Sequence, residues 1–218
     1  MILGIDTATA ATAAAVWDPG GTAAERRDDP PEGQRPAHGA RLLVLVEEVL
    51  AEAGAGWDAI GRIAVGVGPG GFTGLRLGVA TARALAQARG LPLVGVSSLA
   101  ALAAGADGRA ERVVAVIDAR RGEVFAAAPG EFEPLALAPV ALAARVAPGT
   151  LAVGDGAVRF REELERAGAE VPAGDSPLHR VSALQVCRIG AAGEPSDRDT
   201  LLPDYRREPD AKPPRLPK

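Results

Sequence analysis

One strand–loop–helix unit, between Ile63 and Arg89, most constrains how this chain can fold. The apolar run from Ile63 to Val67 predicts a short buried strand, and the loop Gly68-Pro69-Gly70-Gly71 follows it directly. After the loop, the pattern predicts a helix from Thr73 to Arg89, which a Gly-x-Pro segment ends. The loop is thus a tight strand-to-helix turn, in which the Pro-Gly pair sets the backbone.

Strands and helices alternate on both sides of this unit. Two apolar runs within the first 18 residues predict a strand hairpin, joined by the small, hydroxyl-rich segment 6–12. A helix is predicted at 38–53, a strand at 93–96, and a helix at 99–104 that Ser97 or Ser98 caps. The alternation predicts an α/β fold around a mixed sheet. Segment 26–36 contains three prolines, and we expect it to be a loop.

The second half of the chain shows a similar but weaker pattern. It predicts strands at 113–117, 124–128 and 151–153, with a turn at 120–122, and helices at 160–167 and 181–189. Because a strand hairpin opens each half, two related lobes are expected. We assign residues 1–106 to an N-terminal lobe, 107–202 to a C-terminal lobe, and 203–218 to a proline-rich tail.

The composition excludes several classes of function. The 218 residues carry 24 basic and 28 acidic side chains, a formal charge of −4, so the chain lacks the basic surplus of a typical nucleic-acid-binding protein. A single cysteine, Cys187, excludes an internal disulfide and a multi-cysteine metal site, and His38 and His179 form no two-histidine motif. We therefore expect no metal. The sequence contains no secretion signal and no apolar run of about 18 residues, so we expect a cytoplasmic protein without membrane contact.

The glycine-rich loop contains the spacing G-x-G-x-x-G at Gly66, Gly68 and Gly71. A dinucleotide site also needs an acidic residue about 20 residues later, but none occurs between Ala59 and Ala106. No Lys-Ser or Lys-Thr pair follows the glycines, as a P-loop requires. A structural turn is therefore favoured, although the free N–H groups at the start of the helix keep anion binding available.

The turn of the first hairpin reads Asp6-Thr7-Ala8-Thr9. Sugar kinases, actins and Hsp70 proteins place Asp-x-Gly-Thr or Asp-x-Gly-Ser there, so that backbone N–H groups reach a phosphate. Here Ala8 replaces the glycine, and its Cβ obstructs close approach. The turn and the glycine-rich loop together form a candidate vestigial nucleotide site, or a purely structural loop site, of Asp6, Thr7, Thr9, Gly68, Gly70, Gly71 and Thr73.

The two long predicted helices carry unusual surfaces. Helix 38–53 contains the run 42–46, which is apolar nearly all round, whereas a surface helix normally has a polar face. Helix 73–89 has a small residue at every fourth position, which permits close helix approach. Either the helices bury against a partner's helices, or they pack on the sheet and on each other. The candidate interface residues are Leu42, Leu45, Val46, Val49, Gly74, Gly78, Ala82 and Ala86.

Other polar residues give weaker indications. A stretch without acidic residues contains Arg62, Arg76, Arg83 and Arg89, which is typical of a solvated basic face or of contact with an acidic partner or an RNA backbone. The two histidines and the cysteine form no recognisable catalytic arrangement, and no G-x-S-x-G motif marks a nucleophilic serine.

Several segments resemble, in order, those of the bacterial tRNA threonylcarbamoyladenosine biosynthesis protein TsaB (YeaZ) family. They are ILGIDTATAA, HGARLLVLVEEVL, IAVGVGPGGFTGLRLGVATARALA, PLVGVSSLAALA, VIDARRGEVFAA and PDYRR. The resemblance implies an actin/Hsp70-like ATPase superfamily fold, which is ribonuclease H-like, in two lobes with mixed sheets flanked by helices. Two departures stand out: Gly71 occupies the position of a usual serine, and His38-Gly39 replaces a usual His-Ser.

The resemblance also implies a function. It implies a scaffold subunit without catalytic residues or cofactor, which binds the catalytic paralogue TsaD through helices 38–53 and 73–89. The small ATPase TsaE joins the assembly, which transfers a threonylcarbamoyl group to N6 of adenosine 37 in tRNAs that decode ANN codons. Alone, such a subunit is expected to homodimerise through the same surface and to meet tRNA only within the complex. The His-x-x-x-His metal motif of TsaD is missing here. The alternative is an active nucleotide-dependent transferase or peptidase that uses the cleft between the lobes.

Overall fold

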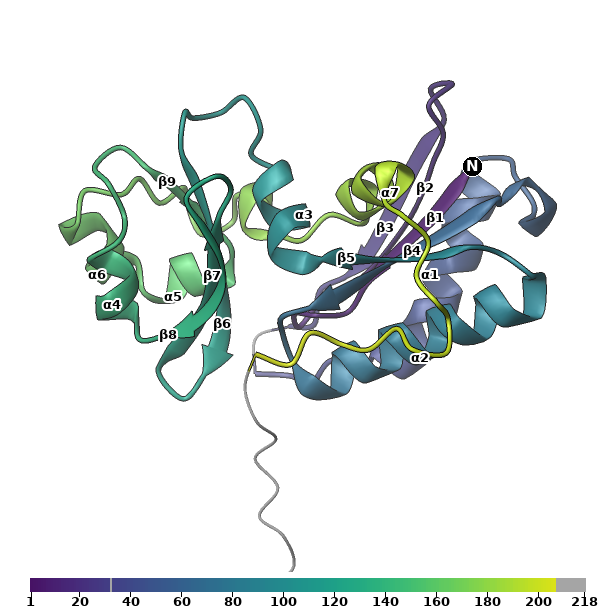
Figure 1. Cartoon of the computed structure of the whole chain (residues 1–218), viewed down its shortest axis with the longest axis horizontal. Coiled ribbons are helices and arrows are strands. Elements are labelled where there is room, and N and C mark those ends of the chain that lie inside the picture. Colours follow the sequence, from purple (N-terminus) through teal and green to yellow (C-terminus); the bar gives the residue numbers. More distant parts are fainter. Residues whose placement is uncertain (32, 207–218) are drawn as a thin grey trace, which may run out of the picture.

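The protein consists of two lobes, each built on one mixed β-sheet (Figure 1). The computed structural model describes residues 1–31 and 33–206. The first sheet has five strands in the order β3-β2-β1-β4-β5, and the second has four in the order β8-β7-β6-β9. Within the described residues, no helix is long and apolar enough to cross a membrane.

The first sheet combines an antiparallel meander with two parallel strands. Its strands are β1 (Ile2–Asp6), β2 (Thr12–Trp17), β3 (Ala23–Asp28), β4 (Arg62–Gly68) and β5 (Leu93–Ser97). β1 pairs antiparallel with β2 and parallel with β4, and a short 3-10 helix (Trp57–Ala59) precedes β4. The expected loop at 26–36 therefore begins later than predicted, because its first three residues complete β3.

Helices cover both faces of this sheet. Because side chains alternate along a strand, Leu3 and Ile5 face α1 (His38–Glu52) and α2 (Phe72–Arg89), whereas Gly4 faces α7 (Ala183–Ala192). A Cβ on Gly4 would lie 2.6 Å from the sulfur of Cys187, so glycine permits α7 to pack this closely.

The second lobe is smaller and carries helices on both faces of its sheet. Its strands are β6 (Val113–Arg120), β7 (Glu123–Ala128), β8 (Phe132–Leu137) and β9 (Leu151–Val153). One face packs against α4 (Pro139–Ala143), α5 (Asp155–Arg159) and α6 (Arg161–Arg166). The other face packs against α3 (Ser98–Ala104), which follows β5 directly and shares a core with both sheets. Ser97 caps α3, as expected, by accepting a hydrogen bond from the Ala100 N–H.

The end of the chain returns to the first lobe. A 3-10 helix (Pro177–His179) leads to α7, and the C-terminal strap, residues 194–206, then runs along β5 and α2 toward the second lobe (Figure 1). The Ser196 N–H donates to the Leu93 carbonyl at 2.8 Å, and the Asp204 N–H donates to the Val67 carbonyl at 2.7 Å. The expected division assigned α7 and most of the strap to the C-terminal lobe (107–202), and the end of the strap to the tail (203–218). In the structure, α7 and the strap both lie against the first sheet. Of the expected tail, residues 207–218 lie outside the described part of the chain.

Candidate functional site

Asp6 ends β1 and is buried, and both of its carboxylate oxygens accept hydrogen bonds. Its Oδ1 accepts a hydrogen bond from the Ala8 N–H at 2.9 Å, and its Oδ2 accepts one from the Ser98 hydroxyl at 2.6 Å. Burial raises the pKa of Asp6 despite these bonds. A Cβ on Gly66 would overlap the Asp6 carboxylate, so the first glycine of the G-x-G-x-x-G spacing makes room for a buried acid rather than for a ligand.

The small residues of α2 also make room for the first hairpin. Thr7 is buried, and its hydroxyl donates to the Gly74 carbonyl at 2.7 Å. A Cβ on Gly74 would overlap the Thr7 carbonyl, and a Cβ on Gly78 would overlap the Thr7 hydroxyl. The ridge expected to receive a second helix is thus occupied, over its first two positions, by Thr7 of the same chain.

All eight candidate interface residues are buried within the chain. Leu42, Leu45, Val46, Val49, Ala82 and Ala86 belong to the core of the first lobe. The larger apolar side chains that α1 and α2 expose are different ones: Leu43 is 52% exposed, Val44 42% and Phe72 38%. We call the solvent-facing sides of these two helices the outer face, which includes Ala40, Leu43, Val44, Ala80 and Ala84.

A cleft of about 920 Å³ lies between the lobes. Its walls come from the first hairpin turn, the segment before α1, the start of α2, the β6–β7 hairpin and the end of the strap. Of the seven residues predicted as a vestigial nucleotide or loop site, Thr9, Gly70, Gly71 and Thr73 line this cleft. The other three lie behind its wall, where Asp6 and Thr7 are buried and Gly68 turns the backbone at a φ of 101°.

Two acidic residues belong to the second-lobe wall of the cleft. Asp118 accepts ion-pair contacts on Oδ2 from Arg159 at 2.7 Å and from Arg120 at 3.2 Å. Its N–H donates to Oδ1 of Asp155 at 3.0 Å. Burial raises the pKa of Asp155, and the nearby Asp118 charge adds to this effect. A carboxyl pair of this kind can bind cationic groups or exchange protons, but two arginines already neutralise Asp118.

Basic and aromatic side chains form the mouth of the cleft. Arg35, Arg76, Arg120 and Arg206 line it, together with Phe72 and Tyr205. The Arg76 guanidinium lies 3.7 Å from the Phe72 ring centroid, and its Nε donates to the Tyr205 hydroxyl at 2.9 Å. Sequence reasoning singled out only Arg76 among these arginines. Four other residues of the cleft could have been found through the segments VIDARRGEVFAA and PDYRR, which carry the family resemblance. These segments contain Asp118, Arg120, Tyr205 and Arg206.

The other arginines of the predicted basic stretch hold the fold together. Arg62 donates to the carbonyls of Gly190, Ala191 and Gly193 at the end of α7. Arg83 donates to the Asp199 carbonyl of the strap, and Arg89 lies over the Trp57 ring. These three residues are therefore not simply a solvated basic face, and of the four arginines Arg76 alone lines the cleft.

The two histidines and the cysteine have structural partners. His38 shares a 2.8 Å hydrogen bond between its Nδ1 and the Thr12 hydroxyl, and burial lowers its pKa. Nδ1 of His179 accepts from the Gly154 N–H at 3.1 Å. Burial raises the pKa of Cys187, which keeps the thiol protonated and unreactive. In the part of the chain that the structure describes, no three His, Cys, Asp or Glu side chains form a group that could hold a metal ion.

A family model agrees with this architecture. The model described as "TsaD: tRNA N6-adenosine threonylcarbamoyltransferase" matches residues 30–147, which is more than half of the chain. This range includes α1, the glycine-rich loop, α2 and the β6–β7 hairpin, and therefore most of the cleft walls.

Individual relatives narrow the family. The "tRNA threonylcarbamoyladenosine biosynthesis protein TsaB" of Escherichia coli is 43% identical over 126 residues, which cover 57% of this chain and 52% of that protein. The chain thus spans about half the length of this curated relative. The structure titled "YeaZ from Pseudomonas aeruginosa" superimposes with a TM-score of 0.76 at 33% identity, covering 94% of this chain and 98% of that one.

A more distant likeness concerns the fold alone. The ROK hexokinase of Thermus thermophilus matches with a TM-score of 0.52 at 12% identity, and the match covers 87% of this chain. The expected actin/Hsp70-like fold of two lobes with mixed sheets is confirmed by this match and by the two sheets. The sequence match to TsaB and the nearly full-length structural match to YeaZ together show that this chain belongs to the TsaB/YeaZ family.

Proposed function

We propose that this chain is a non-catalytic scaffold subunit of the assembly that forms N6-threonylcarbamoyladenosine at position 37 of ANN-decoding tRNAs. In this proposal it binds a TsaD paralogue through α1 and α2 in the cytoplasm, and the ATPase TsaE joins the larger assembly. The observation that carries the proposal is the exposure of Leu43 and Val44 on a helix whose opposite side is already buried in the core.

The outer face has the properties of a protein-binding surface. α1 buries one side against the sheet, so its exposed apolar residues are not needed for the core of this chain. Small residues at Ala40, Ala80 and Ala84 allow a partner helix to approach closely. The eight candidate interface residues support this surface from behind. When the paralogue is absent, the same surface is available to a second copy of the chain.

The first hairpin supports the absence of catalysis. Asp6, which occupies the position of the phosphate-side acid in related kinases, has both carboxylate oxygens engaged by Ala8 and Ser98. Ala8 adds a side chain where close phosphate approach favours glycine. Because Asp6 lies behind the cleft wall, it is poorly placed to act on a ligand in the cleft.

The first experiment tests complex formation. We would co-express the chain with the TsaD paralogue of its own organism and measure the mass of the complex by size exclusion with light scattering. Leu43→Asp should abolish a 1:1 complex, because it places a charge in an apolar contact. Val140→Asp is the matched control, since Val140 is a 73% exposed residue of α4 in the other lobe. Equal binding by both variants would contradict the proposed surface.

An active nucleotide-dependent transferase or peptidase is the second candidate. The cleft of about 920 Å³ favours it, because it has the size of a small-molecule site and contains the Asp118–Asp155 pair. ATP turnover and peptide hydrolysis by the isolated chain distinguish the two candidates. A clear rate that Asp118→Asn abolishes would establish the second candidate, whereas no turnover supports the scaffold.

A further inference from the structure

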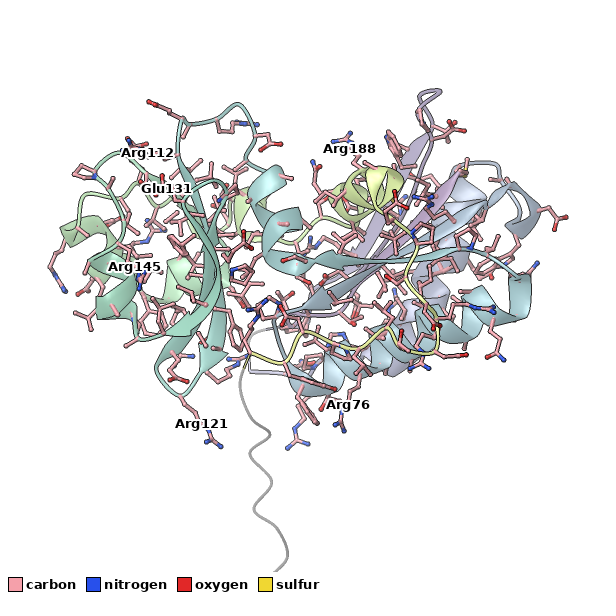
Figure 2. The ribbon with its side chains drawn as sticks, in the orientation of Figure 1. Arg76, Arg112, Arg121, Glu131, Arg145 and Arg188 are labelled. Atoms are coloured by element: carbon pink, nitrogen blue, oxygen red, sulfur yellow. The ribbon has the colours of Figure 1, made fainter. Side chains whose placement is uncertain are left out.

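Arginines from four separate segments meet at the mouth of the cleft. Arg35 comes from the segment before α1, Arg76 from α2, Arg120 from the β6–β7 hairpin and Arg206 from the strap. Figure 2 shows Arg76 and Arg121 pointing outward on the same side of the molecule, one from each lobe. This accumulation contrasts with the formal charge of −4 for the whole chain.

The acidic residues at the mouth are neutralised or shielded. Asp118 contacts Arg120 and Arg159, and Asp204 contacts Arg206 at 2.7 Å. The third, Asp155, is buried, and burial raises its pKa, which favours its neutral form. The same ion pairs use Arg120 and Arg206, so Arg35 and Arg76 are the cleft-lining arginines whose positive charge lies outside them. An anionic ligand is favoured beside these two residues.

Two aromatic rings lie among these arginines. The ring centroids of Phe72 and Tyr205 are 5.3 Å apart. The two residues are 38% and 42% exposed. Arg76 contacts both rings, at 3.7 and 5.8 Å from their centroids. Exposed rings interleaved with arginines offer stacking surfaces for bases and cationic contacts for phosphates, which is how proteins bind unpaired nucleic acid.

We propose that the mouth of the cleft is a contact surface for an unpaired segment of RNA, with Phe72 and Tyr205 stacking on bases and Arg35 and Arg76 contacting phosphates. The arginines and the two rings come from both lobes and from the strap, and the exposed rings favour a ligand with flat bases as well as negative charge over a small inorganic anion. The inference rests on the proposed function, because the assembly presents its RNA substrate to this chain. The surface acts within the complex, since an isolated chain of net charge −4 attracts RNA weakly.

The test compares two charge reversals in the purified complex with the paralogue. The variant Arg35→Glu changes the mouth, and Arg145→Glu is the matched control at an exposed arginine on the outer flank of the second lobe (Figure 2). We would measure the affinity for an ANN-decoding tRNA and its anticodon stem-loop at several salt concentrations. The mouth variant should lose several-fold in affinity, and its salt slope should flatten by about 0.7, the value for one single-strand phosphate contact.

Each outcome has a definite meaning. Equal affinities for the mouth and control variants would overturn the inference while leaving the proposed function intact, provided that both complexes remain 1:1. Competition by poly-glutamate as strong as competition by RNA would also overturn it, because the surface would then attract any polyanion. If the wild-type complex does not form, the proposed function fails, and the same variants are compared as isolated chains at low salt. Photo-crosslinks from 4-thiouridine RNA to Phe72 or Tyr205 would support the stacking contact.

Discussion

The Ser98 hydroxyl donates a 2.6 Å hydrogen bond to Oδ2 of Asp6, and this bond joins the first residue of α3 to the last residue of β1. Both residues are buried. Because α3 also contacts the second sheet, the bond connects the first hairpin to the junction of the two lobes. An acid at the end of β1 thus contributes to lobe geometry instead of reaching into the cleft.

The Asp6 carboxyl predicts a specific dependence of stability on pH. Burial raises its pKa in the folded state, so the folded protein binds more protons than the unfolded chain above the ordinary pKa of 3.8. Its contribution to the free energy of unfolding is fully present below that pKa and is lost as the pH rises through the folded-state pKa. Asp6→Asn should remove this contribution. Urea unfolding of wild type and variant across this window measures it, and identical pH slopes would contradict the prediction.

The loss of the Ser98 hydroxyl should destabilise the fold. Ser98→Ala leaves the buried Asp6 carboxylate with one hydrogen bond fewer, which we expect to cost about 1–3 kcal/mol near neutral pH. The same substitution in the Asp6→Asn background should cost less, because a neutral amide is easier to bury. Ser97→Ala is a useful control, since it removes only the partly exposed cap of α3. A larger loss for Ser97→Ala would show that the cap, and not the buried bond, secures α3.

Gly66 and Asp6 should be energetically coupled. A Cβ on Gly66 would overlap the Asp6 carboxylate, so Gly66→Ala should cost about 1–3 kcal/mol of stability through overpacking. In an Asp6→Ala background the added methyl no longer meets the carboxylate and lies 3.0 Å from the Ser98 hydroxyl, so the cost should fall. A double-mutant cycle measured by chemical unfolding gives the coupling free energy. Additive effects would show that Gly66 is required for another reason.

The elements with strong periodicity were predicted well from the sequence, and the edge strands were not. The first hairpin, α1, β4, α2 and β5 lie within one or two residues of their predicted bounds. β3 and β8 were missed. Each pairs on one side only, at the edge of its sheet, and neither shows a regular alternation of buried and exposed residues. The short helices α4 and α5 were missed because five residues carry too little periodicity.

The candidate site shows a different limit of sequence reasoning. The pattern of small residues on α2 correctly indicated a close approach, but the approaching group is Thr7, which lies 67 residues before Gly74. Likewise, Asp6 and Ser98 are separated by 92 residues. Contacts over such distances depend on the packing of the whole sheet, which no local periodicity contains. The return of the strap to the cleft was not predicted for the same reason.

Gly78→Leu should disturb the fold before it disturbs any partner. Its side chain would collide with the Thr7 hydroxyl inside the first lobe, so we expect the melting temperature to fall markedly. Leu43→Asp lies on the outer face and should leave the melting temperature nearly unchanged. Thermal unfolding of both isolated variants measures this difference. An unchanged melting temperature for Gly78→Leu would show that the ridge has room for a larger side chain.

Tyr205 should hold the strap against α2 and thereby one wall of the cleft. Its hydroxyl accepts from Arg76, its ring contacts Phe72, and the next residue, Arg206, donates to the Pro134 carbonyl of β8 at 3.2 Å. Tyr205→Ala removes the ring and its hydrogen bond, so the strap should open more often and be cleaved faster by a protease such as trypsin after Arg206. Tyr205→Phe keeps the ring and loses only the hydroxyl, so its cleavage rate should lie between those of wild type and Tyr205→Ala. Limited proteolysis followed by mass spectrometry measures these rates. If Tyr205→Ala is cleaved as slowly as wild type, the backbone bond from Asp204 to Val67 is sufficient to hold the strap, and the aromatic cluster has no part in closing the cleft.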